Sequence, residues 1–176
     1  VKSGYRLAKR KKKRYDAERT EEGTSIRRLG ATQNWNFLRG LKVKHKLKNF
    51  IWKCLHGILP VNAVLKERYS KGDQVCKGCE EGPETIEHML FFCCKARLIW
   101  KAAPLSWEGL QVFRNKFWHW WDALKEVAAK EKGDERISLI VNLLWQIWKS
   151  RNEKQFQDCG RDPLVAVQKA VMEWQE

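Results

Sequence analysis

The feature that most constrains the fold is a set of three cysteines and one histidine with the spacing C-x2-C-x8-H-x4-C, formed by Cys76, Cys79, His88 and Cys93. Two cysteines separated by two residues form a knuckle-like turn, which Gly78 is expected to relax. Thiolate and imidazole ligands in tetrahedral geometry suit zinc, and four protein ligands leave no coordination position open for a substrate. The spacing therefore predicts one structural Zn²⁺ per chain.

The second half of this motif is expected at the start of a helix. If Thr85 caps the helix, His88 lies in its first turn and Cys93 follows five residues later, roughly 140° around an α-helix. Cys94 could replace Cys93 as the fourth ligand, and the spacing leaves that choice open. The competing interpretation is two ordinary loop cysteines and an unrelated histidine. It is disfavoured because Cys and His recur at the distances expected of a metal site.

Apolar residues along the rest of the chain recur at helical spacing, and the alternation typical of strands is nearly absent. We expect about six helices, with stop signals at Gly57 and Pro60 and an N-cap at Asp162 before Pro163. The sequence predicts an all-α fold, a small helical assembly with one structural zinc knuckle. The residues expected in its core are Leu47, Phe50, Ile51, Leu55, Phe117, Trp121, Leu124, Leu144 and Trp148.

The ten tryptophans could offer stacking surfaces for unpaired bases. Most of them lie on helical apolar stripes, however, where core packing is the simpler interpretation. Trp52, on the flank of a cationic helix, and Trp118, off its stripe, are the better candidates for exposure. By the same reasoning Cys54 is expected to be a small buried residue, and Cys159 a surface or loop thiol.

Positive charge is concentrated at the N-terminal end of the chain. Residues 1–66 hold 18 Lys and Arg against 4 Asp and Glu, whereas residues 67–176 hold 17 of each, and no acidic residue occurs between positions 23 and 66. Such asymmetry favours a polyanionic partner, RNA or DNA, whose phosphates release counterions when they are neutralised. The residues expected to contact it are Lys9, Arg10, Lys11, Lys12, Lys13, Arg14, Arg39, Lys42, Lys44, Lys46, Lys48 and Lys53.

Composition also divides the chain. We expect a basic arm and linker over residues 1–34, a zinc-binding domain over 35–103, and Trp-rich helices that pack on it over 104–176. The basic run of residues 9–14 fits either a nuclear-localisation signal or a nucleic-acid-binding arm. No apolar run is long enough for a membrane span, and a lysine cluster stands where a signal peptide would be apolar, so we expect an intracellular protein, located in the nucleus. The chain begins at Val1, as expected of a processed product or a fragment.

One ordered series of motifs spans residues 35–100: Lys46-Leu47-Lys48-Asn49-Phe50-Ile51-Trp52-Lys53; Leu59-Pro60 with Leu65 and Arg68; Cys76-x2-Cys79; Glu84-Thr85-x2-His88; and Phe91-x-Cys93 with Ala96 and Trp100. The series resembles the zinc-binding domain that follows the polymerase in plant LINE-type (non-LTR) retrotransposon reverse transcriptases. Residues 1–7 and the motif Trp148-Lys149-x-Arg151-Asn152-x3-Phe156 resemble the segments that flank it. The resemblance implies that Cys76, Cys79, His88 and Cys93 are the ligands. His45 and Arg39 depart from the pattern, where a proline and a tryptophan are expected.

The charge and the resemblance together predict a zinc-stapled module, derived from a retrotransposon reverse transcriptase, that binds RNA or DNA with little sequence specificity. The alternative is a protein-interaction module, a retroelement relic recruited by its host, that docks partners through its Trp-rich C-terminal helices. Catalysis is not expected. Metal-dependent nucleic-acid enzymes need a set of carboxylates, and residues 35–66 contain none.

Overall fold

The computed structural model describes residues 34–70, 72–105, 114–131 and 134–176. The chain falls into two compact units, residues 1–40 and residues 41–176. In the first unit, residues 34–40 are helical. The predicted arm and linker, including the basic run of residues 9–14, lie outside the described residues apart from Asn34. The domain boundaries expected at 34/35 and 103/104 stay predictions.

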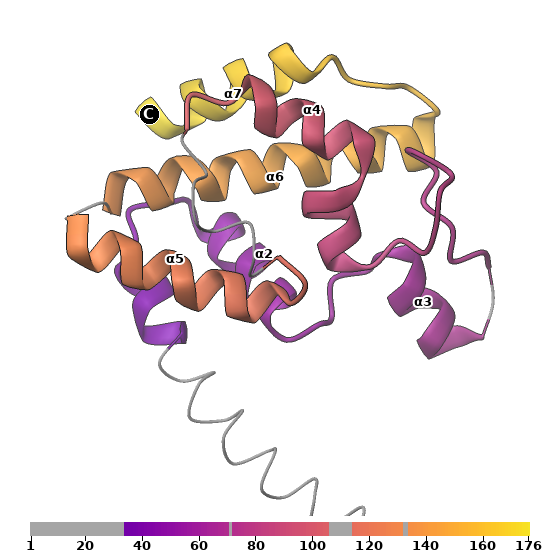
Figure 1. Cartoon of the computed structure of the whole chain (residues 1–176), viewed down its shortest axis with the longest axis horizontal. Coiled ribbons are helices and arrows are strands. Elements are labelled where there is room, and N and C mark those ends of the chain that lie inside the picture. Colours follow the sequence, from indigo (N-terminus) through magenta and orange to yellow (C-terminus); the bar gives the residue numbers. More distant parts are fainter. Residues whose placement is uncertain (1–33, 71, 106–113, 132–133) are drawn as a thin grey trace, which may run out of the picture. The chain divides into compact units, whose positions relative to one another are not determined.

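The described residues of the second unit are helical and form no β-strand, so the all-α prediction is confirmed. The helices are α2 (His45–Leu55), α3 (Asn62–Tyr69), α4 (Cys94–Ala102), α5 (Phe117–Glu131), α6 (Asp134–Gln157) and α7 (Pro163–Gln175), with a π-helical turn, η1 (His88–Phe92), between α3 and α4 (Figure 1). An isolated bridge joins Val75 to Pro83 in the loop between α3 and η1.

Helix α2 forms as its apolar spacing predicts. Its buried residues are Leu47, Phe50, Ile51 and Cys54, and no acidic residue lies in its first turn. The chain leaves the helix at Gly57, whose φ of 64° lies in the left-handed region that favours glycine. Leu55, predicted in the core, is only half-buried because it is the last helical residue and less of the helix surrounds it.

Helix α6 is the central element of the second unit. It packs against α2, α4, α5, α7 and η1, and Figure 1 shows it running between α7 and α5. Ile137, Ile140, Val141 and Leu144 are therefore buried. Trp148, predicted in the core, is half-buried instead, because burial along α6 ends at Ile147 and every later residue of the helix is half-buried or exposed.

Large aromatic side chains fill the space between η1 and α5. Phe91 lies 4.8 Å from Trp120 and 6.2 Å from Phe117, centroid to centroid, and Phe117 lies 6.3 Å from Trp121. Aromatic pairs have preferred geometries, and such contacts stabilise the core beyond the apolar area that they bury. These tryptophans are core residues as predicted, whereas Trp118 is 47% exposed, also as predicted.

Two further local predictions concern Asp162 and Trp52. Asp162 caps α7: its Oδ1 accepts hydrogen bonds from the backbone N–H of Leu164 at 2.7 Å and of Val165 at 3.4 Å, and Pro163 follows at the first helical position. Trp52, expected to be exposed, is half-buried because its ring packs against His56, with the two ring centroids 4.2 Å apart.

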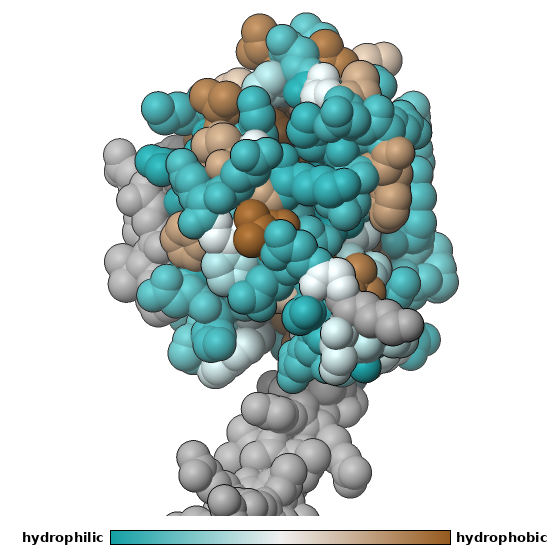
Figure 2. All heavy atoms as spheres, turned by 90° about the vertical axis from the view of Figure 1, so that its right-hand side faces the viewer, coloured by the Kyte–Doolittle hydropathy of each residue, from teal (hydrophilic) through white to brown (hydrophobic). Residues whose placement is uncertain are grey.

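The surface shows two further properties. On the face seen in Figure 2, hydrophilic side chains cover most of the surface and hydrophobic ones are scattered. Among the described residues, no helix is long and apolar enough to cross a membrane.

Candidate metal centre

The first two cysteines of the motif lie in a short loop that is braced like a hairpin. The Cys76 N–H donates to the Gly82 carbonyl at 2.9 Å, and the Glu84 N–H donates to the Gln74 carbonyl at 2.7 Å. The Glu80 N–H closes the turn by donating to the Cys76 carbonyl at 2.8 Å. These bonds hold Cys76 and Cys79 on the same side of the loop.

Gly78 supplies space for sulfur atoms, rather than the conformational freedom that the sequence suggested. Its φ is not positive, and the left-handed residue of the turn is Glu80, at 59°. A Cβ built on Gly78 would lie 3.2 Å from the Cys93 Sγ and 3.5 Å from the Cys76 Sγ. A side chain at position 78 would therefore press on two of the four candidate ligands.

The other two residues of the motif are brought together by a π-turn. The Thr85 hydroxyl oxygen accepts a hydrogen bond from the His88 N–H at 3.0 Å, so Thr85 caps the turn as predicted. The chain then winds more widely than an α-helix, and the Cys93 N–H donates to the His88 carbonyl at 2.7 Å. This five-residue closure replaces the α-helical geometry on which the expected 140° offset was based, because a π-turn bonds residues five apart.

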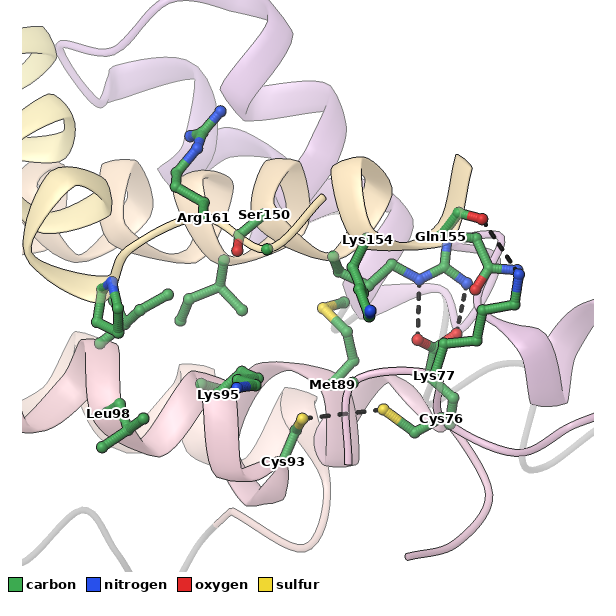
Figure 3. Close-up of a pocket in the computed structure, with 18 of the residues that line it drawn as sticks. Cys76, Lys77, Met89, Cys93, Lys95, Leu98, Ser150, Lys154, Gln155 and Arg161 are labelled. Atoms are coloured by element: carbon green, nitrogen blue, oxygen red, sulfur yellow. Dashed lines mark hydrogen bonds and ion pairs between the residues drawn. The ribbon is translucent and has the colours of Figure 1, made fainter. Parts of the chain in front are cut away.

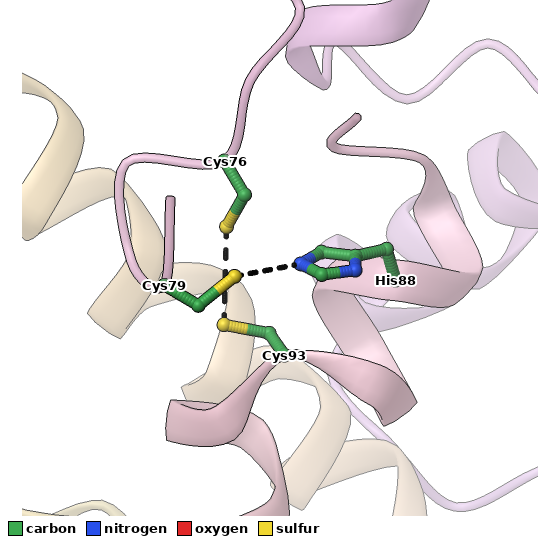
Figure 4. A group of neighbouring side chains, drawn as sticks. All are labelled: Cys76, Cys79, His88 and Cys93. Carbon is green, nitrogen blue, oxygen red and sulfur yellow. Dashed lines mark hydrogen bonds between the residues drawn. The ribbon is translucent and has the colours of Figure 1, made fainter. Parts of the chain in front are cut away.

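The four side chains converge on one point (Figure 4). The three Sγ atoms and the His88 ring nitrogen lie within 4.8 Å of one another. The Cys79 Sγ is 3.2 Å from the His88 Nε2 (Figure 4). The Cys76 Sγ is 3.8 Å from the Cys93 Sγ (Figures 3 and 4). A tetrahedron with metal–sulfur bonds of about 2.3 Å has sulfur–sulfur edges of about 3.8 Å. The set therefore fits a tetrahedral thiolate–imidazole site, and 3.8 Å is far too long for a disulfide.

The structure distinguishes between the two adjacent cysteines that the spacing left open. Cys93 is buried and belongs to the cluster, whereas Cys94 is exposed, with its Sγ 4.0 Å from the Gly78 carbonyl oxygen. The two remaining thiols are as predicted, since Cys54 is buried in α2 and Cys159 is exposed in the loop between α6 and α7.

The cluster perturbs the pKa values of its thiols. The hydrogen bond between the sulfurs of Cys76 and Cys93 lowers the pKa of Cys76 and raises that of Cys93, because one thiolate is stabilised at the expense of the other. Burial raises the pKa of the Cys79 thiol. Burial also raises the pKa of Cys54 well above its ordinary value, which leaves that thiol neutral and unreactive. Repulsion among thiolates at this distance favours a bound cation.

A buried polar network anchors the loop to the helices. The carboxylate of Glu84, 1% exposed, accepts hydrogen bonds from the Asn62 backbone N–H at 2.9 Å and from Arg151 Nε at 2.8 Å, while Arg151 Nη2 bonds its second oxygen. The Asn62 side chain accepts from Arg151 Nη2 and donates to the Val75 carbonyl, next to the first ligand. Neither spacing nor periodicity predicted this network. Its only signal in the sequence was that Glu84 and Arg151 belong to the motifs that resemble the reverse-transcriptase domain and its flanking segment.

The basic residues predicted to bind nucleic acid are only partly described. Arg39 is exposed and lies in the first unit, and Lys9, Arg10, Lys11, Lys12, Lys13 and Arg14 lie outside the described residues. The other five lie in or just before α2. Lys48 is half-buried, and the exposed ones are Lys42, Lys44, Lys46 and Lys53.

Two of these exposed lysines already have partners. Lys44 forms an ion pair with Glu176, and Lys46 Nζ lies 5.7 Å from the centroid of the Trp145 ring. Within the described part of the chain, Lys42 and Lys53 have no acidic partner. Lys46 and Lys53 are thus exposed on α2, Lys42 and Lys44 are exposed just before it, and none of the four belongs to the metal cluster.

The sequence matches, over residues 1–100, the family described as zinc-binding in reverse transcriptase. The match covers more than half of the chain and includes all four residues of the cluster. The chain belongs to this family. No curated protein and no solved structure matches it.

Proposed function

We propose that Cys76, Cys79, His88 and Cys93 bind one structural Zn²⁺, and that the zinc-stapled module binds RNA or DNA with little sequence specificity. The observation that carries the proposal is the convergence of three sulfurs and one imidazole nitrogen within 4.8 Å. The family match supports the zinc assignment. When bound, the ion would cross-link the loop, through Cys76 and Cys79, to both ends of the π-turn.

The proposed site is closed, because all four tetrahedral positions would be taken by protein atoms. The proposal therefore includes no catalytic activity. Elemental mass spectrometry of the native protein tests it, with one zinc per chain as the expected result. Removal of the ion by a chelator should lower the melting temperature, because metal binding contributes folding free energy. Native protein without zinc would refute the assignment.

The nucleic-acid part of the proposal is supported by charge. All of the net +14 lies in residues 1–66, and the exposed lysines around α2 face no acidic residue of their own helix. The Lys44–Glu176 pair is an exposed contact, which is worth little in water, so a phosphate could displace it. A salt-series titration against single-stranded RNA, single-stranded DNA and duplex would count the phosphate contacts.

The finer parts of the proposal concern origin and location. The motif order over residues 35–100 supports descent from a plant LINE-type retrotransposon reverse transcriptase. The basic run of residues 9–14 supports a nuclear location. Expression of the full chain as a fluorescent fusion, with and without residues 9–14, tests the second point.

The alternative, a protein-docking module, is favoured by a few exposed apolar side chains on the C-terminal helices. These are Trp118, Phe156, Leu164, Val165 and Met172. The described tryptophans of these helices other than Trp118 are buried or half-buried, so they offer little docking surface. Absence of oligonucleotide binding by the full chain would favour this alternative.

A further inference from the structure

A pocket of about 380 Å³ lies beside the metal cluster, between the cysteine loop, α4, the end of α6 and the start of α7 (Figure 3). Its volume falls within the range of small-molecule sites. Its inner wall is apolar and includes Met89, Ala96, Ile99, Ile147 and Pro163. The α2 lysines are not part of it, so it is a separate feature of the surface.

Three lysines from three elements surround this apolar wall. Lys77 comes from the cysteine loop, Lys95 from α4 and Lys154 from α6. Figure 3 shows Lys95 and Leu98 of α4 on one side of the pocket and Ser150 and Lys154 of α6 on the other.

Two of these lysine side chains are positioned by contacts with the protein. Lys77 Nζ donates to the Gln155 carbonyl at 3.3 Å, which joins the cysteine loop to the end of α6. The stem of Lys95 lies over Gly78, with its Cγ 3.8 Å from a Cβ built there. Within the described residues, neither Lys77 nor Lys95 forms an ion pair with an acidic side chain. Both charges remain available to an anion.

The two carboxylates that line the pocket are already occupied. Glu84 is bonded through both oxygens to Arg151, and the Asp162 Oδ1 accepts from the backbone N–H groups of α7. Arg161, although it lines the pocket, directs its guanidinium to Glu153 and Gln146.

Two exposed carboxylates outside the lining, Asp158 and Glu80, offset part of the lysine charge. Asp158 forms an ion pair with Lys154, and its pKa is lowered mainly by Lys154 and also by the charge of Lys77. Lys95 has no such neighbour among these contacts. The charge of Glu80 also acts on Lys154, so two carboxylates stand against the three ammonium groups, and Lys77 and Lys95 remain as the cations at the mouth of the pocket.

An apolar recess with ammonium groups at its mouth fits a ligand that has a flat apolar body and an attached phosphate. We infer that this pocket takes one unpaired nucleotide of a single-stranded nucleic acid, with the base against the apolar wall and the adjoining phosphates on Lys77 and Lys95. Bases stacked inside a duplex cannot enter a recess without being extruded. The inference rests on the proposed function, and it adds a preference for single strands that the α2 lysines alone would not give.

The test fills the pocket without changing charge. Ser150 is half-buried on α6 and lines the pocket, so Ser150→Phe places a ring inside it. We expect about a tenfold loss of affinity for oligouridylate and oligothymidylate, because one base loses its contact with the apolar wall, and no change for duplex. Equal losses for RNA and DNA mean that the base is recognised, whereas a loss for RNA alone means that the ribose contributes.

A second pair of variants keeps the test valid if Ser150→Phe does not fold. Lys77→Glu with Lys95→Glu reverses charge at the mouth, and Lys66→Glu with Lys169→Glu makes the same change at exposed positions of α3 and α7 outside the pocket. Only the first pair should weaken single-strand binding more than duplex binding. Zinc content and circular dichroism of each variant report on folding.

The outcomes distinguish the two proposals. If the wild-type chain binds no oligonucleotide, the proposed function fails, and the pocket assignment fails with it. If the wild type binds single strands and the folded Ser150→Phe variant binds them equally well, the pocket assignment alone is overturned. Equal effects of the two charge-reversal pairs would also overturn it.

Discussion

Arg151 and Glu84 form a buried, bidentate ion pair across 67 positions of sequence. Glu84 lies within the residues that match the family, whereas Arg151 lies beyond them, on α6. The carboxylate is 1% exposed, so it needs this partner to stay charged in the interior. The loop that carries the first two cysteines is thereby tied to the C-terminal helices. The segment that matches the family does not contain the counter-charge that Glu84 needs.

Removing one member of this pair should be costly. We expect Arg151→Met to lower the free energy of unfolding by roughly 3 to 5 kcal/mol, because it leaves a buried carboxylate without its counter-charge. The double variant Arg151→Met with Glu84→Leu should cost less than the sum of the two single variants. Urea denaturation of the zinc-loaded protein measures all three. Additive destabilisation would mean that the two side chains do not interact as the structure shows.

The two adjacent cysteines should behave differently. Cys93→Ser should abolish stoichiometric zinc and lower the melting temperature, because Cys93 is a buried member of the cluster. Cys94→Ser should retain one zinc per chain, because that thiol is exposed and points elsewhere. Elemental analysis of the two purified variants checks this. If Cys93→Ser retains zinc and Cys94→Ser loses it, Cys94 rather than Cys93 is the fourth ligand.

Gly78 and Gly82 provide a matched comparison within one loop. A methyl group at position 78 would lie 3.2 Å from the Cys93 Sγ, whereas one at position 82 would meet nothing within 4 Å. Overpacking of this kind costs typically about 1 to 3 kcal/mol. We expect Gly78→Ala to weaken zinc affinity about tenfold or more, and Gly82→Ala to leave it unchanged. Competition with a chromophoric chelator measures both, and equal affinities would contradict the proposed packing.

Features that depend on near neighbours in the chain were predictable from the sequence. The C-x2-C pair, the cap at Asp162 and the apolar face of α2 are of this kind, so spacing was enough to predict them. The π-turn was not predicted, because a five-residue spacing was interpreted with the α-helical period of 3.6. The Arg151–Glu84 pair has no periodic signal, since its members meet only through the packing of α6 on the rest of the fold.

Leu55 and Trp148 were predicted to be buried but are half-buried, and the reason again lies in tertiary packing. An apolar stripe indicates which face of a helix is buried, but it does not indicate where burial ends along the helix axis. That limit is set by the neighbouring elements, which a single stripe does not encode.

The last prediction concerns the exposed lysines of residues 41–55. Replacing Lys42, Lys46 and Lys53 together with Glu should weaken binding to all oligonucleotide sequences about equally, because phosphates carry no base identity. The salt dependence should become shallower by about 0.7 to 0.9 for each phosphate that is no longer neutralised. The control replaces Lys66, Lys101 and Lys169, which are exposed on other helices, and makes the same change in net charge. It should leave affinity closer to that of the wild type.

The N-terminal arm offers the competing explanation for any binding, and deletion of residues 1–20 separates the two. If α2 contributes as proposed, the deleted chain keeps measurable, salt-dependent affinity, and the triple substitution reduces it further. Circular dichroism must show that the triple variant is folded, because Lys46 also contacts the Trp145 ring. If the deletion removes all affinity while the triple substitution removes none, nucleic-acid binding belongs to the arm, and the folded unit has another role.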